Sequence, residues 1–296
     1  KVAIVLNIAL VCGIFFLIYF CAKKFFPHQT AWKLLCLSFI VTVYPSNLYF
    51  TQLTMVEIFL TFTYWGILAV FLENQKDERL WKEILLTFLS IFIFFVHQRC
   101  LGITVAAMAC LLPDLLKNRK YRKLVFLIVS AVIFCFIGLY IKNIYQDYLF
   151  STAISSDTMA QNDFGGQIGK ITYLLSFEGI FAFIKSVLGK VFYMGTATFL
   201  VSYFSIALIV KKCFKFNNAL KRISFEWVAG LFILLSVVFS IAIASIFMID
   251  FNGRFDLLIY GRYFEFTIGP LLLIGIGKLL EIKLPYRYVF LTVLMH

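Results

Sequence analysis

Residues 2–22 read VAIVLNIALVCGIFFLIYFCA, a run that contains no Asp, Glu, Lys or Arg. A transmembrane helix needs about 20 mostly apolar residues to cross the hydrocarbon core of a bilayer. The run is therefore long and apolar enough to span a membrane. No cationic leader with a small-residue cleavage site is visible, so we interpret the run as a span rather than as a signal peptide.

The composition of the whole chain agrees with this first stretch. Hydrophobic residues make up 62% of the 296 residues and charged residues 14%, against about 45–50% and roughly 25% in a soluble domain. These values exclude a disordered chain and a disulfide-stapled secreted module. The sequence predicts an all-α fold, a polytopic bundle of transmembrane helices.

Further apolar runs of sufficient length follow along the chain. One stretch, residues 84–112, is too long for a simple span and carries His97-Gln98-Arg99 at its centre. It is either one span with a buried cation or two short helices, 84–96 and 100–112, that turn at these polar residues. The other candidate spans are 32–50, 53–72, 124–141, 191–210, 227–249, 263–280 and a truncated run that starts near 286.

The basic residues favour the helical hairpin. With the hairpin, and with the first residue outside, nineteen Lys and Arg lie in inner loops and eight lie outside, as the positive-inside rule requires. The acidic residues divide as seven inside and eight outside, so the net charge of +12 belongs to the inner side. Short basic loop ends do not form one surface, which disfavours a nucleic-acid partner. We expect about nine complete spans and a truncated tenth.

We expect a single transmembrane domain over residues 1–296, as a fragment of a longer protein, with a long outer loop at 142–190. Its part from 151 to 169 is rich in Ser, Gly, Asp, Asn and Gln and is typical of an irregular loop. Its part from 177 to 191 has apolar residues at helical spacing, which indicates a helix lying in the membrane interface. The alternative is an extension of the span at 191–210.

Polar residues at the predicted outer face are the candidates for function, because ionisable groups near membrane spans are costly to maintain. In the first cluster, residues 44–52, Pro45 breaks a helix, and Tyr44, Asn47 and Gln52 are candidate sugar contacts. Glu57 follows as the only carboxylate near the start of the next span. Capping and packing near the interface are the alternative roles for these side chains.

Two further clusters carry arginines. Arg99 lies at the tip of the predicted hairpin, where a guanidinium is suited to a phosphate. The alternatives are that it reaches the membrane interface or pairs with Glu57. The last cluster has a glycine, Gly261, that lets the backbone bend. Arg262 and Glu265 are three residues apart and are expected on one helix face, either as a substrate site or as a self-satisfied ion pair. The substrate-binding candidates of this cluster are Arg254, Asp256, Arg262, Tyr263 and Glu265.

The order of these features resembles bacterial integral-membrane glycosyltransferases of the GT-C type, including the mannosyltransferase-like and arabinosyltransferase-like enzymes. The matching features are Tyr44-Pro45 before Glu57, Arg99 followed by Gly102, the long outer loop, and Tyr260-Gly261-Arg262-Tyr263 before a late span with Pro270. The resemblance covers most of the chain but has no single diagnostic motif. It implies a multi-pass protein of the bacterial cytoplasmic membrane that serves cell-envelope assembly.

The resemblance also implies partners. The donor would be a polyprenyl-phosphate sugar in the membrane lipid, and the acceptor a glycan, lipid or protein on the outer side. The family's catalytic carboxylate would lie upstream of Lys1, with Glu57 as a weak substitute. The sequence assigns no cofactor, and a divalent metal ion is the alternative that it leaves open. The alternatives are a polysaccharide polymerase or ligase, and a transporter of lipid-linked sugars or solutes.

Overall fold

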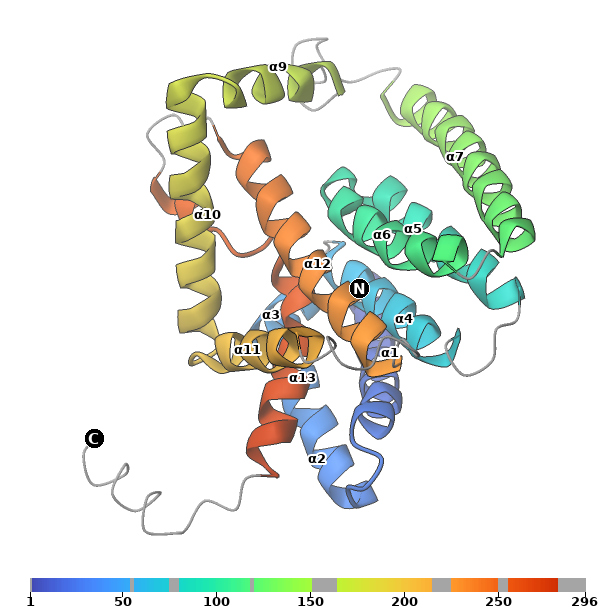
Figure 1. Cartoon of the computed structure of the whole chain (residues 1–296). Coiled ribbons are helices and arrows are strands. Elements are labelled where there is room, and N and C mark those ends of the chain that lie inside the picture. The colour runs from blue at the N-terminus through green and yellow to red at the C-terminus, as the bar shows by residue number, and fades with distance from the viewer. Residues whose placement is uncertain are drawn as a thin grey trace.

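The protein is described by a computed structural model, which covers residues 2–53, 56–74, 80–117, 120–150, 164–214, 225–249 and 255–281. Within these ranges the chain is helical and contains no β-strand, as the composition predicts. Figure 1 shows the helices gathered into one bundle.

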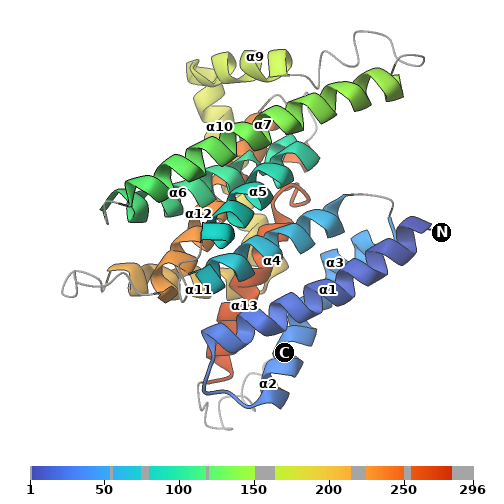
Figure 2. The same ribbon diagram turned by 90° about the vertical axis from the view of Figure 1, so that its right-hand side faces the viewer.

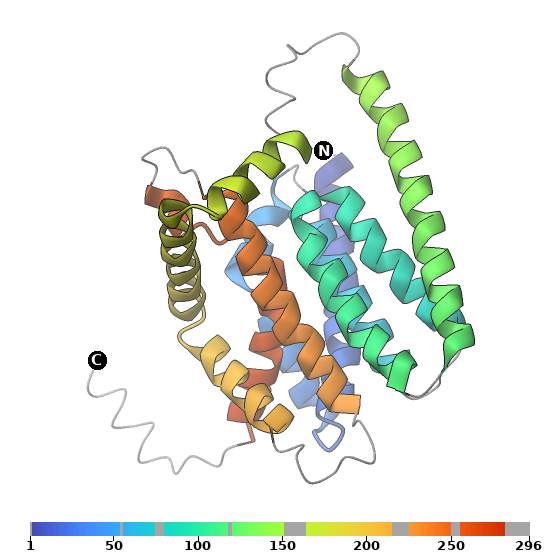
Figure 3. The ribbon, with the colours of Figure 1, turned by 45° about the horizontal axis from the view of Figure 1, so that its top comes forward.

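Four helices lie side by side in one row. They are α1 (Val2–Phe25), α4 (Glu57–Asn74), α5 (Leu80–Val96) and α7 (Tyr121–Phe150), and each packs against the next (Figure 2). The last helix, α7, forms the outer edge of the row (Figure 3) and exposes many apolar side chains, among them Phe126 and Phe136. An exposed apolar face of this kind is typical of a helix in contact with lipid.

The stretch 84–112 forms two helices, as the hairpin interpretation predicts. The helix α5 ends at Val96, and α6 (Leu101–Lys117) runs back along it. The hydroxyl of Thr104 donates to the carbonyl of Ser90, which joins the two helices near their turn. On its other side α6 packs against α12 (Phe225–Phe247). A Cβ on Gly102 would lie 2.9 Å from the α12 backbone, so the glycine permits this close approach.

The predicted helix break at Pro45 is also present. Helix α2 (Ala31–Thr42) and helix α3 (Pro45–Thr51) are bent by 60° relative to each other, and Pro45 is the first residue of α3. Proline is well suited to this position because its missing N–H has no intrahelical partner there. The predicted span at 32–50 is therefore broken into two helices.

The region 142–214 differs from its prediction. The helix expected at 124–141 is longer, since α7 continues to Phe150, and residues 164–169 are helical rather than irregular, as part of α9 (Phe164–Leu174). Residues 151–163 lie outside the described part of the chain. One helix, α10 (Phe177–Ala197), covers the segment 177–191, and a break separates it from α11 (Val201–Phe214), so a single span at 191–210 is not present. Helix α10 is long and apolar enough to cross a membrane, and its location in the membrane interface stays a prediction.

The break between α10 and α11 falls at Thr198–Leu200. Phe199 and Leu200 adopt positive φ angles of 48° and 63°, a conformation that side chains other than glycine seldom take. The side chain of Thr198 bonds to the carbonyl of Met194 and to the hydroxyl of Ser202. Local side-chain bonds of this type compete with a continuous helix.

The end of the described chain returns to the centre of the bundle. Two short 3-10 helices, η3 (Phe255–Leu258) and η4 (Glu265–Thr267), precede α13 (Ile268–Leu279). The span predicted at 263–280 thus begins with a turn and becomes α-helical only at Ile268. Aromatic side chains fill the adjoining core, where the rings of Phe71 and Phe232 stack at a centroid distance of 4.6 Å.

Four of the described helices are long and apolar enough to cross a membrane, and the bent pair α2 and α3 would make a fifth. These four are α1, α7 up to Tyr145, α10 and the part of α12 from Val228. The hairpin helices α5 and α6 have 17 residues each, which corresponds to about 26 Å, slightly less than the thickness of the hydrocarbon core. The structure thus supports a multi-pass membrane protein, while the count of nine spans stays a prediction.

Lysines occupy the last turns of α1, α11 and α13, which meet at one end of the bundle. At this end, which we call the basic end, Lys24 pairs with Glu73 at 2.6 Å and Lys123 pairs with Glu83 at 3.0 Å. The first pair joins the C-terminal ends of α1 and α4. The second pair joins the N-terminal ends of α5 and α7. The positive-inside rule predicts that this end is cytoplasmic. The helix starts and turns that hold Glu57, Arg99 and Arg262 lie at the opposite end.

Candidate functional site

A buried ion pair joins two distant parts of the sequence. Glu57 is the first residue of α4, and Arg262 lies in the turn between η3 and η4. The Nε–H of Arg262 donates to Oε1 of Glu57, although 205 residues separate them. The side chain of Arg262 is 30% exposed and that of Glu57 is 10% exposed. Oε2 of Glu57 is buried without a hydrogen-bond partner, so the direct bond from Arg262 is the main compensation of this carboxylate.

Arg99 has a different partner. Its guanidinium carbon lies 3.1 Å above the centre of the Tyr263 ring, an arrangement in which the negative face of the ring attracts the cation. The structure therefore assigns Glu57 to Arg262 rather than to Arg99. It brings the second and third sequence clusters together, because Tyr263 follows Arg262 directly.

His97 holds the turn that carries Arg99. Its Nδ1 accepts a hydrogen bond of 3.3 Å from the backbone N–H of Arg99 and so caps the 3-10 helix η1 (Gln98–Cys100). Burial, together with the positive charges of Arg99 and Arg262, lowers the pKa of His97 to about 4. A neutral imidazole is also what the cap requires, since a protonated Nδ1 cannot accept a hydrogen bond.

The hydrogen-bond partner of Glu265 is a tyrosine of α10 and not Arg262. The hydroxyl of Tyr193 donates to Oε1 of Glu265. The expectation that Arg262 and Glu265 share a helix face, or form an ion pair with each other, is wrong, because Arg262 lies in a non-helical turn and Glu265 begins η4. Each carboxylate is matched to a partner from another element.

Gly261 is required for close packing rather than for an unusual backbone conformation. A Cβ at this position would lie 2.0 Å from the ring of Tyr193. The turn therefore passes directly against α10 at this point. The preceding 3-10 helix is fixed to α10 too: fully buried Lys190 donates to the hydroxyl of Ser186 at 2.7 Å and to the carbonyl of Leu257 at 3.4 Å.

These elements surround a pocket of about 570 Å³. Tyr193, Tyr260, Arg262 and Glu265 line it from α10 and from the turns around η3 and η4, together with exposed Asp256. The opposite wall comes from the helix that starts at Pro45 and from the residues after it: Pro45, Ser46, Tyr49, Phe50 and Leu53. One cation, two carboxylates and several aromatic rings thus face one cavity.

The remaining predicted residues have other surroundings. Half-buried Tyr44 occupies the N-cap position of α3 without a capping hydrogen bond from its side chain. The amide of Asn47 donates to the carbonyl of Thr42 at 3.2 Å, so it caps the end of α2. Gln52 is exposed at the end of α3 and is not part of the pocket wall. Arg254 lies outside the described residues.

Sequence reasoning missed Tyr193 and Asn7. Tyr193 is a phenol within an apolar helix, three residues after Lys190, and two polar side chains on one face of such a helix are a signal that identifies it. Asn7 is buried in α1, where its amide donates to the carbonyls of Leu53 at 2.8 Å and Thr51 at 3.3 Å. It holds the segment after α3, which includes pocket residue Leu53.

No model of a known protein family, no curated protein and no solved structure matches the chain. Within the described ranges, no three His, Cys, Asp or Glu side chains are grouped as a metal site would require. The site therefore has to be interpreted from its own chemistry.

Proposed function

We propose that the protein is a membrane glycosyltransferase that transfers a sugar from a polyprenyl-phosphate donor to an acceptor. The observation that carries this proposal is the pocket in which Arg262 shares a wall with Asp256, Glu265 and tyrosine rings. Ligand pockets are typically apolar cavities with a few convergent polar groups that fix orientation. Aromatic faces and carboxylates together suit a sugar, and a guanidinium suits a phosphate.

The reaction gives each group a task. The acceptor hydroxyl attacks the anomeric carbon, the bond from this carbon to the phosphate oxygen breaks, and the lipid phosphate leaves with the bonding electrons. Negative charge grows on the phosphate, where Arg262 stabilises it. The carboxylates of Asp256 and Glu265 accept hydrogen bonds from sugar or acceptor hydroxyls. One of these two pocket carboxylates accepts the proton of the acceptor hydroxyl as the new bond forms.

Glu57 has a positioning role in this scheme. It does not line the pocket, and its bond to Nε of Arg262 fixes the direction of the guanidinium. An arginine has five N–H donors, so the terminal nitrogens serve the phosphate while Nε serves Glu57. Arg99 acts from behind Tyr263, where it adds positive potential at the same end of the bundle.

The test uses the full-length protein in liposomes, supplied with a panel of polyprenyl-phosphate sugars and candidate acceptors. Release of polyprenyl phosphate measures transfer. We expect Arg262→Gln to lower the rate by about 100-fold or more, while Arg122→Gln, an exposed arginine on α7, leaves it unchanged. Arg262→Lys keeps a cation beside Glu57 but loses the planar donor set, so a folded and inactive Lys variant separates lost chemistry from lost folding.

Other outcomes would replace the proposal. Movement of the lipid-linked sugar across the liposome membrane without release of polyprenyl phosphate would identify a transporter. Growth of a chain from lipid-linked repeats would identify a polymerase. Unchanged transfer in Arg262→Gln would remove Arg262 from the site.

A further inference from the structure

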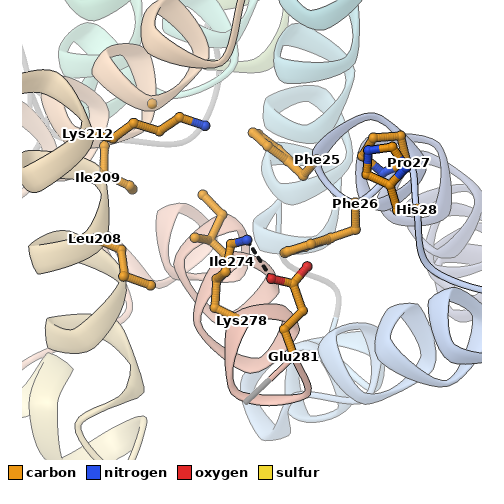
Figure 4. A pocket seen from close by; sticks show the side chains of 11 residues that line it. Phe25, Phe26, Pro27, His28, Leu208, Ile209, Lys212, Ile274, Lys278 and Glu281 are labelled. Carbon is orange, nitrogen blue, oxygen red and sulfur yellow. Dashed lines mark hydrogen bonds and ion pairs between the residues drawn. The ribbon is translucent and has the colours of Figure 1, made fainter. Parts of the chain in front are cut away.

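A second pocket lies at the basic end of the bundle, where the ends of α1, α11 and α13 meet. It has a volume of about 460 Å³, within the range of ligand sites in proteins. Figure 4 shows side chains from these three helix ends pointing toward a common space. None of its lining residues belongs to the proposed sugar-transfer site, so an inference from it is independent of that function.

The inner wall of this pocket is apolar. Phe25 and Phe26 come from the end of α1, Leu208 and Ile209 from α11, and Ile274 from α13. Phe26, Ile209 and Ile274 are each less than 10% exposed. Gly230 of α12 also contributes to the lining, and a Cβ there would lie 2.9 Å from the Cγ2 atom of Ile209. The missing side chain thus keeps this part of the cavity open.

The rim carries cations. Lys212 extends from α11 toward the centre of the pocket, and Lys278 extends from α13 (Figure 4). The ammonium of Lys278 bonds to Glu281 at 2.6 Å and lies 5.6 Å from the ring of Phe26. The side chains of Lys278 and Glu281 are 47% and 34% exposed, and exposed ion pairs of this kind contribute little to stability. A ligand phosphate can therefore replace Glu281 as the partner of the Lys278 ammonium.

Two lysines above an apolar wall are complementary to an anionic amphiphile. A free phosphate would leave the apolar wall unused, and an uncharged lipid would not match the net positive charge of a rim with two lysines and one glutamate. We propose that this pocket binds an anionic phospholipid, with its phosphate held by Lys212 and Lys278 and the start of its acyl chains against Phe26, Ile209 and Ile274. Basic pockets between helices on the cytoplasmic side of membrane proteins bind such headgroups.

The test measures lipid binding to the full-length protein in neutral detergent by titration calorimetry. The probes are dioctanoyl phosphatidylglycerol, dioctanoyl phosphatidylcholine and sodium phosphate. We expect the phosphatidylglycerol to bind at least tenfold more tightly than the phosphatidylcholine. The headgroup of phosphatidylglycerol has a net negative charge, whereas the choline cation of phosphatidylcholine cancels the charge of its phosphate. Sodium phosphate at the same concentrations should give no measurable heat of binding.

Matched variants locate the site. The double variant Lys212→Gln and Lys278→Gln should lose at least tenfold in affinity for the phosphatidylglycerol. Lys211→Gln is the control, because Lys211 is exposed on the same helix and is not part of the pocket lining. All three lysines are exposed, so we expect these variants to fold. Gly230→Val should weaken binding without changing any charge, since its side chain enters the apolar part.

Three results would overturn the proposal. Equal affinity for the two phospholipids would exclude recognition of charge. An equal loss in Lys211→Gln and in the double variant would show diffuse surface attraction. Binding of sodium phosphate as tight as that of the phosphatidylglycerol would identify a free-anion site instead.

Discussion

Replacement of Arg262 by Met is expected to destabilise the protein more than replacement of Glu57 by Gln. Removal of one partner from a buried ion pair costs about 3–5 kcal/mol, because an uncompensated charge stays buried. In the Arg262→Met variant the carboxylate that stays is 10% exposed, and one of its oxygens already has no partner. Since the arginine side chain is 30% exposed, water can partly replace it, and we expect a loss of about 2–3 kcal/mol.

The reverse variant is milder for a physical reason. Glu57→Gln leaves a guanidinium that is 30% exposed and can turn toward water, so we expect a loss of about 1 kcal/mol. The double variant removes both charges of the pair, so neither partner stays behind as an uncompensated buried ion. It should therefore be more stable than Arg262→Met alone, although it carries one more substitution.

The free energy of unfolding is measured by titrating the protein in mixed micelles with sodium dodecyl sulfate. A thiol-reactive dye follows the transition, because Cys21 and Cys100 are fully buried and react only after unfolding. Cys12, Cys36 and Cys135 are exposed at the protein surface, so the dye reaction of the folded protein is measured first and subtracted as the baseline. Additive losses in the double variant, or a larger loss in Glu57→Gln than in Arg262→Met, would refute the reasoning.

Three further predictions concern single side chains. Folding lowers the pKa of His97 from its ordinary value of 6.5 to about 4, so between pH 4 and 6.5 the unfolded chain binds more protons than the folded chain. The free energy of unfolding should therefore decline as the pH falls from 6.5 toward 4. In thermal unfolding scans, His97→Asn should make that decline smaller. Lys190→Met should keep or raise the unfolding temperature, because an apolar side chain of similar length replaces a buried cation; a lower temperature would show that its bonds outweigh its desolvation. Gly261→Ala should lose more than 1 kcal/mol in the dodecyl sulfate titration, because its Cβ meets the ring of Tyr193, whereas Gly66→Ala, with open space around it, should not.

Much of the fold could be predicted from local sequence. Apolar runs identify the helices, and the break at Pro45 follows from the missing backbone donor of proline. The turn at His97 follows from polar residues at the centre of a run that is too long for one span. The region 177–214 could not be divided correctly, because the turn at Phe199 and Leu200 contains neither Gly nor Pro. Without a glycine or a proline, the local sequence does not indicate that a helix ends there.

The sequence also identified most of the polar residues of the candidate site but not their pairing. Charge in an apolar chain is costly wherever it occurs, so Glu57, Arg99 and Arg262 stand out one by one. Their partners depend on which helix ends meet in space. The spacing of Lys190 and Tyr193 marks a polar face of an apolar helix, but it does not show that Tyr193 bonds to Glu265, which lies 72 residues away along the chain.

The amino-acid sequence by itself determined that the described ranges are helical, that several of these helices are apolar enough to span a membrane, and that the basic residues are concentrated in particular loops, because hydrophobicity and charge act at each residue separately. Only the tertiary structure decided that Glu57 pairs with Arg262, that Arg99 lies on Tyr263, and that two pockets lie at opposite ends of the bundle. Ion pairs and cavities are properties of distances between residues that are remote in the chain, and the packing of the helices sets those distances.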